Sequence, residues 1–132
     1  MSSKTIKVLT IDDDDAVQSV IVAFLKRFFG DNKIKCEVKA FTDPIQGVFE
    51  LSSHADQYNV ILLDVRIPKL TGDEIFNSLM NTNPEAVDNV IFITAYPSDL
   101  IARFPNLRLN ILEKPFRYKG FCEKIVEVIK KK

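Results

Sequence analysis

The sequence predicts an α/β fold in which a five-stranded parallel sheet, doubly wound, is covered by helices on both faces. Short apolar runs rich in β-branched residues alternate along the 132 residues with amphipathic segments of helical period. Most of these runs are apolar throughout, which is typical of parallel strands buried on both faces. The length suits one domain of common size, so we expect residues 1–132 to form a single domain.

The first β–α pair occupies residues 6–30. Residues 6–11 (IKVLTI) form a short β-branched apolar run, which predicts a buried strand. The segment after it places apolar residues at helical spacing between Val17 and Phe28. Gly30 is the predicted end of this helix, because glycine commonly follows a last helical turn.

A second β–α pair and a third strand follow. Residues 35–41 (KCEVKAF) alternate between polar and apolar side chains and predict a strand. The helix predicted over 43–54 opens with Asp43 as its N-cap and Pro44 at its first position. Residues 58–65 (YNVILLDV) are the most apolar strand of the chain.

The second half of the chain repeats the alternation. In order, the remaining predictions are a helix over 71–82, a strand over 89–96, a short helix over 97–104, a strand over 109–115 and a helix over 118–132. Pro105 stops the short helix. These five β/α units predict the parallel sheet named above.

Polar side chains stand where the predicted strands end. Asp12 and Asp13 follow the first strand, and Asp64 ends the third. Thr94 lies at the end of the fourth strand and Lys114 at the end of the fifth. Because parallel strands with right-handed crossovers share one carboxyl edge, where ligands bind in such sheets, these residues are expected to meet there.

The run IDDDDAV places four carboxylates side by side. Like charges about 4 Å apart repel by about 1 kcal/mol even in water, so a partner should offset them. Mg²⁺ is held by carboxylate oxygens, which makes Asp12 and Asp13 predicted ligands, with Mn²⁺ as the alternative ion. Asp14 and Asp15 lie at a helix start, and Gln18 suits a capping box that favours Asp15 as N-cap over Asp14. Taken alone, the run is as compatible with four solvated or capping aspartates as with a metal site.

Asp64 follows the apolar run NVILL and is predicted to be buried. An unpaired buried carboxylate is costly, but a metal ion and Lys114 beside it would keep it ionised. Such a carboxylate can attack phosphorus and form an acyl phosphate. Lys114 and Thr94 would then bind phosphoryl oxygens, although each taken singly suits a structural or surface role better.

At these residues the chain resembles the receiver domains of two-component response regulators, the family of the chemotaxis response regulator. VLTIDDDDAV resembles the first strand and acid pair, and VILLDVRIPKLTG the phosphoacceptor segment. VIFITAY resembles the hydroxyl-bearing fourth strand and LEKPF the lysine–proline segment. The resemblance covers nearly the whole chain. It implies a flavodoxin-like sheet of order 2-1-3-4-5 and a phosphorelay signalling module rather than an enzyme.

The resemblance also implies a role for each site residue. Asp64 is the implied phosphoacceptor. The implied Mg²⁺ site combines Asp12, Asp13 and Asp64 with the backbone carbonyl of Arg66.

The implied phosphoryl-binding and switch pair is Thr94 and Lys114, and the Lys114–Pro115 bond is expected to be cis. The family usually carries Tyr or Phe three residues before the lysine, where this sequence has Ile111. Together with the short fourth helix, this departure puts in doubt the usual coupling between the threonine and an aromatic ring.

The composition limits the classes of partner that can be expected. The 18 basic and 18 acidic residues give zero formal net charge, which argues against a dedicated nucleic-acid binder. No apolar run reaches membrane-spanning length, so no membrane partner and a cytoplasmic location are expected. Phe104, Phe116 and Tyr118 are candidates for a partner surface or, equally, for core packing.

The leading hypothesis is a phosphorylation switch whose donor is a histidine kinase or phosphotransfer protein. The only histidine of the chain, His54, is predicted to be a surface residue, so the donor must be external. A Mg²⁺-dependent aspartyl phosphatase is disfavoured, because Arg66 stands where that class needs an acid/base aspartate. A receiver-like interaction module that no longer switches remains the alternative.

Overall fold

A computed structural model describes residues 5–65 and 72–130. The strands are β1 (Ile6–Ile11), β2 (Cys36–Phe41), β3 (Val60–Asp64), β4 (Val90–Thr94) and β5 (Asn110–Glu113). The helices are α1 (Asp15–Asp31), α2 (Pro44–His54), α3 (Gly72–Thr82), α4 (Pro97–Arg103) and α5 (Tyr118–Lys130). Two 3-10 helices, η1 (Ala55–Gln57) and η2 (Pro84–Asn89), were not predicted, because segments this short carry no readable period.

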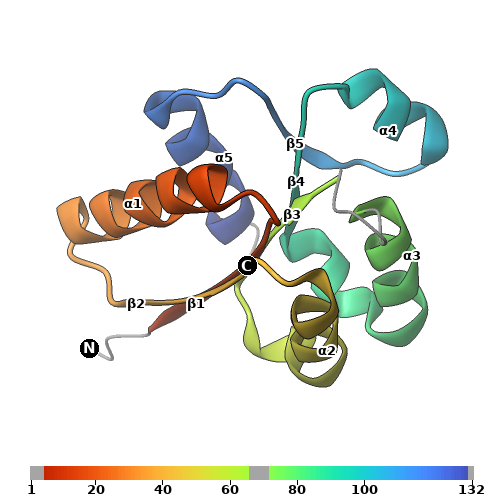
Figure 1. Ribbon diagram of the computed structural model, residues 1–132, viewed down its shortest axis with the longest axis horizontal. Coiled ribbons are helices and arrows are strands. Elements are labelled where there is room, and N and C mark those ends of the chain that lie inside the picture. Colours follow the sequence, from red (N-terminus) through yellow and green to blue (C-terminus); the bar gives the residue numbers. More distant parts are fainter. Residues whose placement is uncertain (1–4, 66–71, 131–132) are drawn as a thin grey trace.

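The five strands are all parallel and lie in the order β2-β1-β3-β4-β5 (Figure 1). This confirms the predicted fold class and strand order. The strands are up to two residues shorter at each end than predicted. Among the described residues, no helix is both long and apolar enough to cross a membrane.

Helices cover both faces of the sheet (Figure 1). Alternate side chains of β1 show why, because successive residues of a strand point to opposite faces. Val8 packs into a core with residues of α1 and α5, such as Leu25 and Ile125. Leu9 packs into the opposite core with residues of α2, α3 and α4, such as Leu51.

Helix α1 differs from its prediction at both ends. Its N-cap is Asp14, whose Oδ1 accepts hydrogen bonds from the N–H groups of Ala16 and Val17 at 2.9 and 3.2 Å. The preference for Asp15 was therefore wrong. The helix runs past Gly30 to Asp31, because the left-handed residue that ends the turn is Lys33 with φ 56°.

Phe104, Phe116 and Tyr118, the candidates for a partner surface or for core packing, all pack against other aromatic rings. Phe104 lies edge-on to Phe76, with ring centroids 5.3 Å apart. Phe116 and Tyr118 lie edge-on to Phe24 of α1, at 6.1 and 5.2 Å. All three are half-buried, so they join helices to the sheet and to each other.

At Gly47, α2 comes close to the side chain of Ile11 on β1. A Cβ atom at this position would lie 2.9 Å from both Cγ1 and Cδ1 of Ile11, which is itself buried. We expect Gly47→Ala to lower the free energy of unfolding by about 1–3 kcal/mol, because overpacking outweighs the better helix propensity of alanine. Urea unfolding followed by circular dichroism measures the difference.

Gly30→Ala is the matched control, since a Cβ there has no atom within 4 Å. That variant should be neutral or more stable by up to about 1 kcal/mol. Equal stabilities of the two variants would contradict the close approach at Gly47.

Candidate functional site

The carboxyl edge of the sheet brings together residues from four strands. Asp64 is paired in register with Ile93 of β4, and Thr94 with Glu113 of β5. The backbone N–H of Lys114 continues this ladder by donating to the carbonyl of Thr94 at 2.8 Å. The sheet itself therefore fixes the relative positions of these strand ends.

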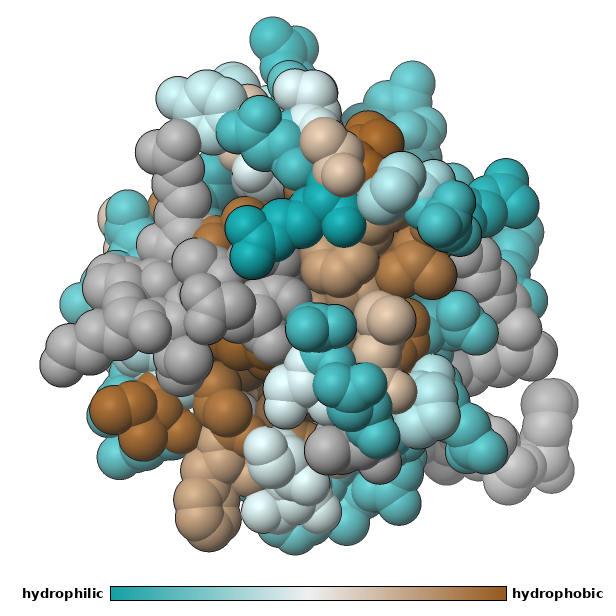
Figure 2. Space-filling model, turned by 90° about the vertical axis from the view of Figure 1, so that its right-hand side faces the viewer, coloured by the Kyte–Doolittle hydropathy of each residue, from teal (hydrophilic) through white to brown (hydrophobic). Residues whose placement is uncertain are grey.

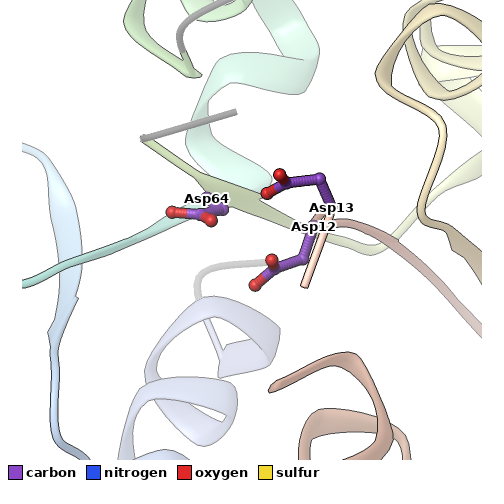
Figure 3. Close-up of side chains that lie close together, drawn as sticks. All are labelled: Asp12, Asp13 and Asp64. Carbon is purple, nitrogen blue, oxygen red and sulfur yellow. The ribbon is translucent and has the colours of Figure 1, made fainter. Parts of the chain in front are cut away.

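Three carboxylates form a cluster at this edge. One oxygen each of Asp12, Asp13 and Asp64 lies within 4.8 Å of the other two. Figure 3 shows the three side chains extending in the same general direction from the ends of β1 and β3. Asp12 and Asp64 are only 1% and 4% exposed, whereas Asp13 is exposed. Such a set of hard oxygen donors suits a divalent cation.

Asp12 gives the clearest indication of a metal ligand. Its Oδ1 accepts a hydrogen bond from the N–H of Asp14 at 2.9 Å, but its buried Oδ2 has no partner among the described residues. Burial raises the pKa of the Asp12 carboxyl to about 7, against the lowering effect of the Asp14 hydrogen bond and with a further rise from the Asp64 charge. An orphaned carboxylate oxygen facing other carboxylates is what a metal ion would satisfy.

Lys114 and Thr94 flank Asp64 on the side of β4 and β5. The Lys114 ammonium lies 3.4 Å from Oδ1 of Asp64, in a half-buried ion pair. Thr94 is buried, and its hydroxyl oxygen accepts a hydrogen bond from the N–H of Tyr96 at 3.0 Å. The edge thus combines a carboxylate, a cation and a hydroxyl within one small site.

The Lys114–Pro115 peptide bond is cis. Ile111 is half-buried and packs against the core beneath α3 and α4. Arg66 lies outside the described residues, so its carbonyl remains a prediction.

Comparison with known proteins decides the family. The sequence model of the response regulator receiver domain matches residues 8–126. The chain belongs to this receiver-domain family. The match confirms the family resemblance indicated by the four sequence motifs. Receiver domains are signalling modules of two-component systems.

Solved receiver domains share this fold. A response regulator receiver domain protein from Clostridium thermocellum superposes with TM-score 0.78 at 20% identity, covering 96% of this chain and 95% of that one. The receiver domain of a sensor histidine kinase from Pseudomonas aeruginosa gives TM-score 0.77 at 22% identity, covering 96% and 99%. That structure has a magnesium ion coordinated in its active-site cleft.

Relatives by sequence are longer proteins. An uncharacterized response regulatory protein of Yersinia pestis is 24% identical over 93% of this chain and 48% of its own length. A protein-glutamate methylesterase/protein-glutamine glutaminase of Pseudomonas savastanoi is 34% identical over 66% of this chain and 23% of its own length. This receiver domain spans less than half the length of these curated relatives.

Receiver domains bind Mg²⁺ in an acidic pocket, and Asp12, Asp13 and Asp64 form an acidic group that could hold a metal ion here. One buried residue next to this receiver site was misread from the sequence. Gln18 does not close a capping box, because its amide is turned into the core toward Thr10 and Phe41. A readable signal existed, since Gln18 lies on the same helical stripe as Ile21 and Leu25.

Proposed function

We propose that this receiver domain accepts a phosphoryl group on Asp64 in a Mg²⁺-dependent transfer from a histidine kinase or phosphotransfer protein, and that phosphorylation changes its binding to a downstream partner. The observation that carries the proposal is the placement of Asp64. This buried carboxylate stands between the acidic pair Asp12–Asp13 and the Lys114 ammonium.

The transfer step follows from these positions. An Asp64 carboxylate oxygen attacks the phosphorus of the donor's phosphohistidine, forming an O–P bond while the N–P bond breaks. The bonding electrons leave with the imidazole nitrogen, which takes a proton from solvent. Lys114, 3.4 Å from Asp64 Oδ1 before transfer, then pairs with a phosphoryl oxygen.

Thr94 would bind a second phosphoryl oxygen with its hydroxyl hydrogen, since that oxygen atom already accepts from the N–H of Tyr96 and keeps its own proton to donate. Asp12, Asp13 and Asp64 would hold Mg²⁺. When bound, the ion supplies positive charge that neutralises the carboxylates and the phosphoryl oxygens.

The donor protein needs a surface next to Asp64. A shallow hollow of about 440 Å³ lies between α1 and the segment after β5, and its lining residues are Val17, Val20, Ala95, Lys114, Pro115 and Phe116. Its apolar lining beside the phosphoacceptor supports docking of the donor here.

The downstream partner is expected on the side that carries α4. Tyr96, Ile101 and Leu107 from this region are each 40% exposed or more. Figure 2, which turns the right-hand side of Figure 1 toward the viewer, shows apolar side chains exposed among hydrophilic ones. Because Ile111 offers no aromatic ring, the readout is expected to pass through α4 packing instead.

The test is phosphorylation by small donors. With Mg²⁺ and acetyl phosphate or phosphoramidate, intact mass spectrometry should find one added phosphoryl group that hydroxylamine removes, as for an acyl phosphate. With EDTA in place of Mg²⁺ the gain should disappear.

No mass gain with either donor, in a folded protein that binds Mg²⁺, would refute acceptance from small donors. It would favour the receiver-like interaction module that no longer switches. A gain that survives EDTA would contradict the role of the metal.

A further inference from the structure

Gln18 is a polar residue in an apolar place. It lies in the second turn of α1 on the buried stripe that continues with Ile21, Leu25 and Phe29, and it is 5% exposed. A buried amide without partners is costly, so its environment must satisfy it. That environment is the carboxyl end of β1 and β2, next to the turn that carries Asp12 and Asp13.

The Gln18 amide makes three hydrogen bonds, to two strands. Its Oε1 accepts from the hydroxyl of Thr10, which is fully buried, at 2.8 Å. Its Nε2 donates to the carbonyl of Thr10 at 3.3 Å and to the carbonyl of Phe41 at 3.1 Å. One side chain thus ties the start of α1 to the last residues of both β1 and β2.

The backbone connects the hydrogen bonds of Gln18 to the carboxylates of the proposed Mg²⁺ site. The Phe41 carbonyl that accepts from Gln18 also accepts from the N–H of Asp12, at 3.1 Å. Thr10 lies two residues before Asp12 on the same strand, and Asp14 two residues after it caps α1. The turn that carries Asp12 and Asp13 is therefore held at both ends, by β1–β2 pairing and by α1.

The hydrogen bonds of Gln18 oppose the electrostatic repulsion within the acidic cluster. When all three carboxylates are ionised and no cation is bound, Asp12, Asp13 and Asp64 repel one another across no more than 4.8 Å, and this repulsion acts on the turn between β1 and α1. A turn free to relax would let the carboxylates move apart. They would then have to be gathered again when a cation binds, and this reorganisation would weaken binding.

We propose that Gln18 is a positioning residue for the Mg²⁺ site, holding the Asp12–Asp13 turn at metal-binding spacing by cross-linking α1 to the ends of β1 and β2. This inference rests on the proposed function. Besides packing α1 against the sheet, Gln18 would position the acidic turn, because its amide hydrogen-bonds to Thr10 and Phe41, the strand residues next to that turn.

The test replaces the amide by an apolar side chain of similar length and measures Mg²⁺ affinity. Gln18→Met should weaken Mg²⁺ binding about tenfold, the lower range seen when residues that orient metal ligands are lost. Isothermal titration calorimetry gives the dissociation constant. The amide NMR signals of Asp12 to Asp14 in the metal-free protein should shift or broaden as well.

A matched control separates positioning from stability. Asn110 is also a nearly buried amide, and its Nδ2 donates to the carbonyls of Asp88 and Val90 at 3.3 and 3.2 Å, at the opposite edge of the sheet. Asn110→Leu should lower the urea midpoint as Gln18→Met does but leave Mg²⁺ affinity within about twofold. If Gln18→Met does not fold, Thr10→Val removes only the 2.8 Å bond and should weaken Mg²⁺ binding about two- to threefold.

The outcomes are distinct. Weaker Mg²⁺ binding in Gln18→Met (or in Thr10→Val, should Gln18→Met fail to fold) but not in Asn110→Leu supports the positioning role. Unchanged binding in the folded Gln18 variant, or equal weakening in the Asn110 variant, overturns it and leaves the proposed function intact. Failure of the unsubstituted protein to bind Mg²⁺ overturns the metal-dependent function and the inference with it.

Discussion

Asp64→Asn is expected to abolish phosphoryl incorporation, with a loss of roughly a hundredfold or more, because a neutral amide is not a nucleophile toward phosphorus. Asparagine keeps the size and shape of the aspartate, so the buried position should still pack. The ion pair of Asp64 with Lys114 is lost, as is one carboxylate of the metal cluster. Incorporation should therefore be measured by intact mass at saturating Mg²⁺, so that weaker metal binding does not by itself explain the loss.

Asp43→Asn is the matched control for this experiment. Asp43 is exposed, and its Oδ1 accepts from the N–H of Ile45 to cap α2. Asparagine caps helices about as well as aspartate, so this variant changes the net charge equally and should be phosphorylated normally. A hydroxylamine-sensitive phosphoryl group on Asp64→Asn would place the acceptor elsewhere, with Asp12 and Asp13 as the nearest carboxylates.

Asp12→Asn is expected to stabilise the metal-free protein by up to about 4 kcal/mol at pH 8. The pKa of the Asp12 carboxyl is raised from 3.8 to about 7 by burial, so the ionised form is disfavoured in the native state. Asparagine removes that charge. Its oxygen can keep the hydrogen bond from the Asp14 N–H, and its NH₂ group replaces the orphaned Oδ2 next to Asp64.

The sign of the pH dependence follows from the raised pKa. Between about pH 4 and pH 7 the unfolded chain loses the Asp12 proton while the native protein keeps it, so the unsubstituted protein loses stability as the pH rises. The advantage of Asp12→Asn should therefore be small at pH 4, grow through this window and be complete above it. Urea unfolding in EDTA at several pH values measures it.

Mg²⁺ should reverse the order of stability. The unsubstituted protein gains stability when the ion binds its native state, whereas the variant lacks one ligand and gains little. Asp15→Asn, an exposed position in the first turn of α1, should change stability by no more than about 0.5 kcal/mol. A variant at Asp12 that is no more stable than the unsubstituted protein at pH 8 in EDTA would contradict this account of the acidic cluster.

Much of the fold could be predicted because its signals are local. Five apolar runs separated by helical periods suffice to indicate a parallel sheet with helices on both faces, and β1 was predicted to the residue. The exceptions were the two 3-10 helices and the ends of α1. Asp14 and Asp15 are equally good caps by residue type, and the choice depended on whether Gln18 faced the helix end or the core.

The candidate site was predictable for a different reason. Parallel strands bring their carboxyl ends to one edge, so residues distant in sequence, such as Asp12 and Lys114, could be assigned to one site without coordinates. The chemical type of each residue then indicated its task. Arg66 remains a prediction, since it lies outside the described residues.

The β/α alternation, the residues at the carboxyl edge and the departure at Ile111 could all be predicted, because they follow from periodicity and residue type. The contacts that those residues make became visible only in the folded chain. The tertiary structure placed the Lys114 ammonium 3.4 Å from Asp64, left Oδ2 of Asp12 buried without a partner among the described residues, and brought the Gln18 amide onto the carbonyl of Phe41. Burial and hydrogen bonding between distant segments depend on how helices pack on the sheet, which no local pattern records.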